Sequence, residues 1–128
     1  MRNKITDLSD VALFENEVTG TELAGTIEFE INEQHIFEGA LVPTTRRLFV
    51  NVYDRYGNVL KQSIRLEDIT DIRQSRQILL GNILHIWVGN EVLITMHGIP
   101  QIKLEKFVRF LRKYRAKAMH IEDYGTVV

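Results

Sequence analysis

The stretch GALVPTTRRLFVNVYD, from Gly39 to Asp54, places two apolar runs on either side of a short polar segment. The second run alternates, which is the period of two expected of a strand. One face of it carries Leu48, Val50 and Val52. Pro43 cannot donate a hydrogen bond to a strand ladder, so it is expected to end the first strand. The stretch therefore predicts an antiparallel hairpin with residues 44–47 at its tip.

Further strands are predicted on both sides of this hairpin. Residues 26–32 (TIEFEIN) alternate between apolar and polar positions. Gly39 lies inside a predicted strand, where a bulge or a sharp bend is expected. Gly57-Asn58 and Gly89-Asn90 separate apolar runs, and such residues tolerate the backbone conformations of tight turns. Seven short strands are predicted in all.

After Pro100 the apolar period changes from two to that of a helix. This predicts a C-terminal amphipathic helix at about 101–119, with a basic outer face. A short helix is predicted near Ser9, within an N-terminal segment, 1–23, and whether this segment packs on the sheet is left open. The main domain is predicted at 24–120, and residues 121–128 are expected to form a tail.

The composition is that of an ordinary globular domain: 128 residues, with 45% hydrophobic and 26% charged residues. There is no cysteine, which excludes disulfides and thiolate sites. Neither a secretory signal nor a membrane-spanning run is visible, so a cytoplasmic location is expected, with the inner face of the membrane as an alternative. Residues 1–45 carry a net charge of −7 and residues 46–128 a net charge of +6, an asymmetry that can steer partners or simply neutralise within the fold.

The predicted fold class is mainly β, or α+β by content. We expect a seven-stranded antiparallel, partly open barrel, or two packed orthogonal sheets, capped by the C-terminal helix. The chain resembles bacterial pleckstrin-homology-like domains over residues 24–115. The resemblance lies in the run G-x-L-V-x-T-x-x-R-L from Gly39 to Leu48 and the run S-I-x-L-x-x-I-x-x-I from Ser63 to Ile72. A hairpin of L-x-G-x-L-x-I type and the helix KFVRFLRK follow.

The resemblance implies a helix-capped barrel and does not imply an enzyme. Relatives that bind phosphoinositides carry basic residues across the first two strands. Here that region holds no basic residue and carries Glu28, Glu30, Glu33 and Glu38. Acidic residues would repel a phosphorylated headgroup. The resemblance therefore favours the fold and does not favour binding of such a headgroup.

No catalytic, cofactor-binding or metal-binding residues are predicted. The histidines show no ligand spacing, since no HExxH motif occurs. His85 and His97 come closest to a metal pair, across one hairpin, but lack further ligands. Phosphate-binding loops and nucleophile elbows are absent as motifs. No RNA-binding aromatic signature occurs, so nucleic acid is not expected as a partner.

The leading hypothesis is a non-catalytic interaction module that binds a protein or peptide, at a sheet edge or beside the helix. Self-association is an extension of it, through edges and apolar residues such as Phe110, Met119 and Ile121. The alternatives are peripheral binding to an anionic membrane surface and, last, a small-ligand carrier. Thr44 and Arg47 are expected to stabilise the hairpin tip first and to form a contact surface second. The candidate contact surface comprises Arg46, Arg47, Lys103, Lys106, Arg109, Arg112 and Lys113.

Overall fold

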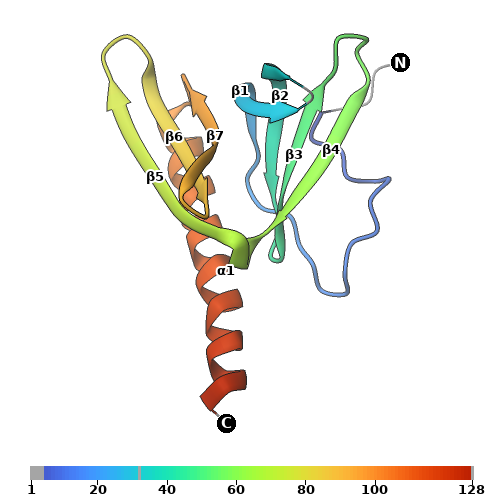
Figure 1. Ribbon diagram of the computed structural model, residues 1–128, viewed down its shortest axis with the longest axis vertical. Coiled ribbons are helices and arrows are strands. Elements are labelled where there is room, and N and C mark those ends of the chain that lie inside the picture. The colour runs from blue at the N-terminus through green and yellow to red at the C-terminus, as the bar shows by residue number, and fades with distance from the viewer. Residues whose placement is uncertain (1–4, 32, 128) are drawn as a thin grey trace.

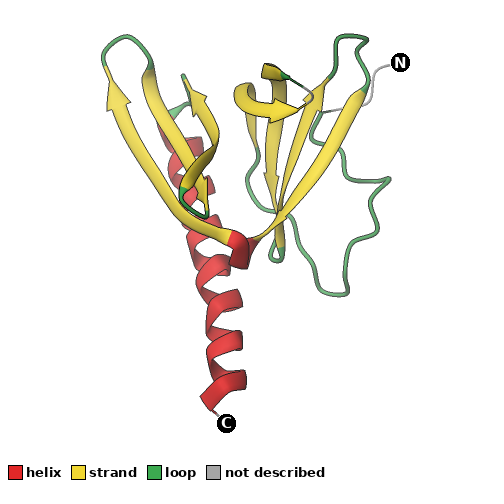
Figure 2. Cartoon of the chain, viewed as in Figure 1, coloured by secondary structure: helices red, strands yellow, loops and turns green. Residues whose placement is uncertain are grey.

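The computed structural model describes residues 5–31 and 33–127, and helical side chains up to Met119. Figures 1 and 2 show seven strands followed by one long helix. The elements are β1 (Leu23–Ile31), β2 (Gln34–Pro43), β3 (Arg47–Tyr53), β4 (Val59–Arg65), the short 3-10 helix η1 (Leu66–Asp68), β5 (Ile69–Gln77), β6 (Gly81–Val88), β7 (Glu91–His97) and α1 (Gln101–Val127).

The strands form one antiparallel sheet in the order β4-β3-β2-β1-β7-β6-β5. The sheet does not close, because β4 and β5 lie at its two ends. Figure 1 shows β1–β4 and β5–β7 diverging from the η1 region, with α1 running behind β6 and β7. β1 and β7 join the two halves by only two register pairs, Ile27 with Met96 and Glu28 with Thr95. The predicted fold class, a partly open barrel with a C-terminal helix, is confirmed.

The core lies between the two halves of the sheet and the helix. Alternation in β3 turns Leu48, Val50 and Val52 into this core. The helix contributes Leu104, Phe107, Val108 and Leu111, all buried at the predicted helical spacing. The predicted turns at Gly57 and Gly89 are confirmed, and both glycines have positive φ.

Gly39 provides close contact between strands rather than a bulge. It pairs in register with Gly25 on one side and with Val52 on the other. A Cβ atom at position 39 would overlap the carbonyl oxygen of Asn51 and press on Val52. Of the two alternatives expected at Gly39, the bulge is therefore wrong, whereas the bend stays a prediction. The irregularity in this hairpin lies in β1, between Glu28 and Ile31.

The N-terminal segment, residues 5–22, is irregular, so the predicted short helix near Ser9 is wrong. The segment packs on the sheet, a point that the sequence left open. Leu8 forms a second apolar cluster with Val42 and Phe49, on the outer face of β2 and β3. The Asn51 amide donates to the Ile5 carbonyl over 2.8 Å. A regular helix would satisfy its own backbone groups, whereas this segment uses several of its groups to bind the sheet.

Two predicted boundaries change. β1 begins at Leu23, so the expected limit between residues 23 and 24 falls inside a strand. α1 continues to Val127, beyond the expected end at 119, so residues 121–127 are helical rather than a tail. The side chains of His120 and Ile121 lie outside the described part. Among the described residues, no helix is long and apolar enough to cross a membrane.

Replacing Gly39 with alanine is expected to destabilise the protein by about 1–3 kcal/mol, because the new methyl group overpacks against β3. Gly89→Ala is the comparison variant. No atom lies within 4 Å of the Cβ position there, so its cost of about 1 kcal/mol arises only from positive φ. Urea unfolding checks both variants. Equal midpoints for the two would contradict the close approach of β2 and β3.

Candidate functional site

The tip of the β2–β3 hairpin is organised around the Thr44 side chain, which is fully buried. Its Oγ1 accepts hydrogen bonds from the amides of Arg46 and Arg47 at 3.1 and 3.0 Å. The same hydroxyl donates to a carboxylate oxygen of Glu17 over 2.5 Å. Thr44 thus binds the turn backbone, as predicted, and also connects it to the N-terminal segment.

Glu17 and Arg47 form a buried, bidentate ion pair. Arg47 Nε donates to Glu17 Oε2 at 3.0 Å, and Arg47 Nη2 donates to Oε1 at 3.2 Å. The Glu17 side chain has an exposed fraction of 0%. Burial alone raises the pKa of Glu17, but hydrogen bonds from Arg47, Thr44 and the Phe14 amide outweigh it, so the pKa lies below its ordinary value. The carboxylate therefore stays ionised inside the fold.

The Arg47 guanidinium also lies between two aromatic rings. Its Cζ is 4.8 Å from the ring centre of Phe14 and 4.7 Å from that of Phe49. With Glu17 neutralising its charge, Arg47 stabilises the fold rather than offering a free cation. Arg46 points outward and remains exposed. The two predicted contact residues at the tip thus have different roles.

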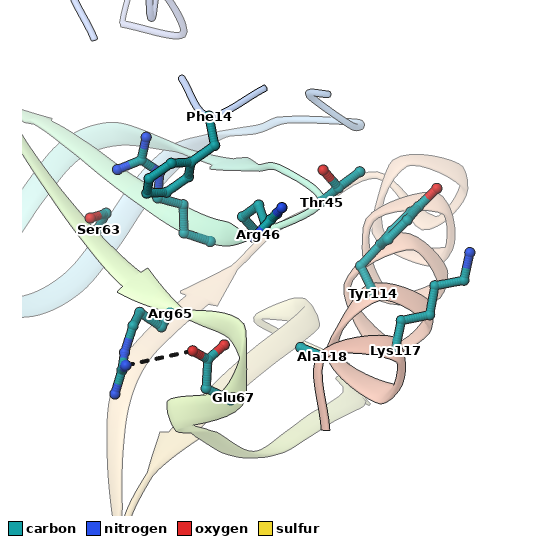
Figure 3. A pocket seen from close by; sticks show the side chains of 10 residues that line it. Phe14, Thr45, Arg46, Ser63, Arg65, Glu67, Tyr114, Lys117 and Ala118 are labelled. Atoms are coloured by element: carbon teal, nitrogen blue, oxygen red, sulfur yellow. Dashed lines mark ion pairs between the residues drawn. The ribbon is translucent and has the colours of Figure 1, made fainter. Parts of the chain in front are cut away.

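A surface hollow of about 710 Å³ opens beside Arg46 (Figure 3). Four separate parts of the chain surround it: the N-terminal segment, the β2–β3 tip, the end of β4 with η1, and the late part of α1. Aromatic Phe14 and Tyr114 form part of its wall. Figure 3 shows Arg46 on one side, and Tyr114 with Lys117 beside its ring on the helix side. The other lining residues are Thr45, Arg47, Ser63, Arg65, Glu67 and Ala118.

Sequence reasoning placed only Arg46 and Arg47 of this hollow in the candidate surface. Phe14, Arg65, Tyr114 and Lys117 were missed as site residues because they are remote from one another in the sequence. Phe14 lies in the N-terminal segment, and 57% of it is exposed. The sequence did contain one indication that Phe14 is exposed: it stands next to acidic residues in a segment without strand periodicity.

The basic residues of the helix do not form one surface. Lys103, Lys106, Arg109 and Lys113 are exposed. Arg112 is exposed as well, but its guanidinium donates to the Ile72 carbonyl over 2.8 Å. Arg115 donates to the carbonyls of Ile69 and Thr70 at 2.5 and 3.1 Å, where β5 bulges. These two arginines cover the beginning of an edge strand, and Arg112 therefore contributes less to a free basic surface than predicted.

A second hollow, of about 550 Å³, lies between the β1–β2 hairpin and β7. Its charged walls are acidic, with Glu28, Glu30 and Glu91. Glu28 and Glu30 belong to the acidic first two strands, where phosphoinositide-binding relatives carry basic residues. An anionic headgroup would be repelled here. The two hollows therefore differ in the charge of the ligand that each would accept.

No protein-family model and no curated protein matches this chain. The resemblance to bacterial pleckstrin-homology-like domains consequently stays a prediction about family, although the fold itself agrees with it. Within the part of the chain that the structure describes, no three histidine or acidic side chains gather as a metal site would require. His85 instead lies 3.0 Å from the Thr95 hydroxyl, through its Nδ1.

Glu17→Gln is expected to lower the free energy of unfolding at pH 7 by roughly 1.5–3 kcal/mol, because it removes charge-assisted hydrogen bonds. The folded pKa of Glu17 is lowered, so the contribution is complete above the unfolded pKa of about 4.3 and is lost as pH falls through the folded value. Urea unfolding at pH 7 and at decreasing pH should show the two proteins converging in acid.

Asp10→Asn is the matched control, because it removes a carboxylate that pairs with Lys61 at an exposed position. This variant should unfold almost as the wild type does, since exposed pairs contribute little. Equal stability of Glu17→Gln and Asp10→Asn at pH 7 would contradict the central role of the buried network.

Proposed function

We propose that the protein is a non-catalytic interaction module of pleckstrin-homology-like type that binds an acidic peptide segment of a partner protein. The binding site is the hollow between Arg46 and Lys117, together with the adjoining edge of β4. The observation that carries the proposal is a pair of cations without a described ion pair beside an uncovered strand edge. Arg46 lies over the Phe14 ring and Lys117 over the Tyr114 ring, and both rings line the hollow. Each component supports one aspect of recognition.

Charge supports an acidic ligand. Arg47 is paired with Glu17, and Arg65 makes ion pairs with Glu67 and Asp68. Arg46 and Lys117 are exposed, and no ion pair joins either to another side chain in the described part. A carboxylate placed between them would gain charge-assisted hydrogen bonds from both sides.

Aromatic surface supports an apolar residue next to that carboxylate. Phe14 stacks on Arg47 and leaves more than half of its own surface exposed. Tyr114 contacts Phe110, with ring centres 4.7 Å apart, and its other side faces the hollow (Figure 3). Rigid aromatic side chains of this kind provide contact area at a low entropic cost. A peptide with one apolar residue close to aspartate or glutamate fits both features.

The edge of β4 supports an extended ligand. β4 is the outermost strand of its half, and no described strand pairs with its outer side. Ser63 and Arg65, at the end of this strand, line the hollow and are exposed. A segment added along β4 would gain backbone hydrogen bonds and deliver its next residues to Arg46. The acidic first third of a second copy, residues 1–45, is one such segment, so self-association through this site is included in the proposal.

The other expectations stay predictions. A cytoplasmic location is compatible with a peptide-binding module and stays a prediction. The small-ligand carrier gains little support, because the space between the sheet halves is filled by side chains such as Phe107 and Ile86, which are fully buried.

Selection from a displayed random-peptide library on the full chain tests the proposal. The enriched peptides are expected to combine aspartate or glutamate with one apolar residue. Arg46→Glu with Lys117→Glu should weaken binding of a selected peptide at least tenfold in fluorescence polarisation, because attraction becomes repulsion. Amide chemical shifts should change at Thr45, Ser63 and Arg65 upon binding.

Arg109→Glu provides the control, since it makes a charge reversal on an exposed position of the same helix outside the hollow. This variant should bind as the wild type does. Enrichment of basic or charge-free peptides, or equal weakening by both charge reversals, would refute the acidic-peptide site.

A further inference from the structure

The β5–β6 hairpin ends in three apolar residues that contact little of the protein. Ile78 and Leu79 have exposed fractions of 101% and 95%, and Leu80 of 45%. The strands stay paired as far as Gln77 and Gly81, so the hairpin is ordered up to this turn. Figure 1 shows the hairpin extending away from the other half of the sheet. Large apolar side chains with this exposure have no role in the core, since truncating them would leave no cavity.

The tip is continuous with the start of the helix. The Gly98 amide donates to the Leu80 carbonyl over 3.0 Å. The Asn82 side chain donates to the Ile99 carbonyl over 2.7 Å, which attaches the turn end of β6 to the β7–α1 connection. Ile102, in the first turn of α1, is itself 68% exposed. Four exposed apolar residues thus belong to one end of the molecule.

The charge around this apolar tip is of one sign. Residues 72–83 and 98–104 contain Arg73, Arg76 and Lys103 and no acidic residue. Arg73 pairs with Asp71, whereas Arg76 and Lys103 are exposed and make no ion pair with a described residue. The two exposed cations therefore lie beside the apolar tip without a nearby acidic residue in these two sequence ranges.

We infer that this end of the molecule is a membrane-anchoring tip that binds an anionic lipid surface. The convex turn of Ile78, Leu79 and Leu80 enters the boundary between headgroups and acyl chains, while Arg76 and Lys103 contact the headgroups. A convex tip suits a deformable lipid interface, and its basic rim matches an anionic leaflet. This inference goes beyond the proposed peptide site and uses different residues.

The absence of cysteine makes a direct test possible, because Leu79→Cys and Tyr56→Cys each offer one labelling position. Tyr56 is the matched control: it is 81% exposed in the β3–β4 turn, outside the proposed tip. An environment-sensitive dye at position 79 should gain fluorescence on vesicles of phosphatidylcholine with phosphatidylglycerol. The dye at position 56 should not. Neutral phosphatidylcholine vesicles should change neither.

Sedimentation of the unlabelled full chain with the same vesicles measures affinity. Ile78→Ser with Leu79→Ser should weaken binding at least tenfold without affecting folding, because both side chains are already exposed. Arg76→Glu with Lys103→Glu should weaken binding and flatten its salt dependence. Tyr56→Ser should bind as the wild type does.

Three results would overturn the inference. The first is no binding to anionic vesicles at low salt. The second is binding that survives the double serine substitution, which would assign the attachment to the exposed lysines of the helix alone. The third is a dimer in solution that the double serine substitution separates, without lipid binding, which would make a second copy the ligand of the tip. The peptide assay leaves the tip intact, so the two proposals succeed or fail separately.

Discussion

The buried contact of Glu17 with Thr44 and Arg47 is the interaction on which the arrangement of this protein depends. An ionised carboxylate inside a fold is costly unless hydrogen bonds replace its lost water. Here a hydroxyl, a guanidinium and a backbone amide replace it, and they come from two segments. The acidic group therefore holds an irregular segment against a hairpin tip. That placement in turn positions Phe14 and one wall of the basic hollow.

The same network shows how the uneven charge of the sequence is used in the fold. The acidic residues of the first third have different surroundings, and only some of them pair with basic residues of the remainder. One glutamate is used at the hairpin tip, while Glu28 and Glu30 line an acidic hollow on the other side of β1. The basic residues cover the helix, the first hollow and the apolar tip. Part of the asymmetry is thus neutralised by pairs such as Glu17 with Arg47 and Asp10 with Lys61, and the acidic hollow keeps part of the rest.

Sequence periodicity predicted the strands and the helix because these elements bury one regular face. Leu48, Val50 and Val52 lie in the core because alternate residues of β3 share one face, as the sequence pattern indicated. The same reasoning failed at Ser9, where a plausible helix start belongs to a segment held by its contacts with the sheet. It also ended the helix too early, because the residues after 119 lack an apolar stripe and a helix can extend past the surface that it covers.

The candidate site was predictable only in part. Arg46 and Arg47 were identified as a pair, yet nothing local distinguishes a cation that will meet Glu17, thirty residues away, from one that will stay free. Similarly, Ile78, Leu79 and Leu80 resemble core residues in a sequence. Their exposure follows from the length of the β5–β6 hairpin, which carries the turn beyond the reach of the helix. Such features depend on tertiary distances that periodicity does not contain.

The cover that Arg112 and Arg115 give to β5 limits how copies of this chain can assemble. An open sheet with two bare edges can add neighbours at both and grow into a fibre. Here the start of one edge is occupied by guanidinium groups, and Arg73 and Arg76 place charge along the rest of that strand. Edge-to-edge pairing through β4 uses the same strand in both copies, so it closes around a two-fold axis. If copies paired in this way, growth by strand addition would stop at a pair.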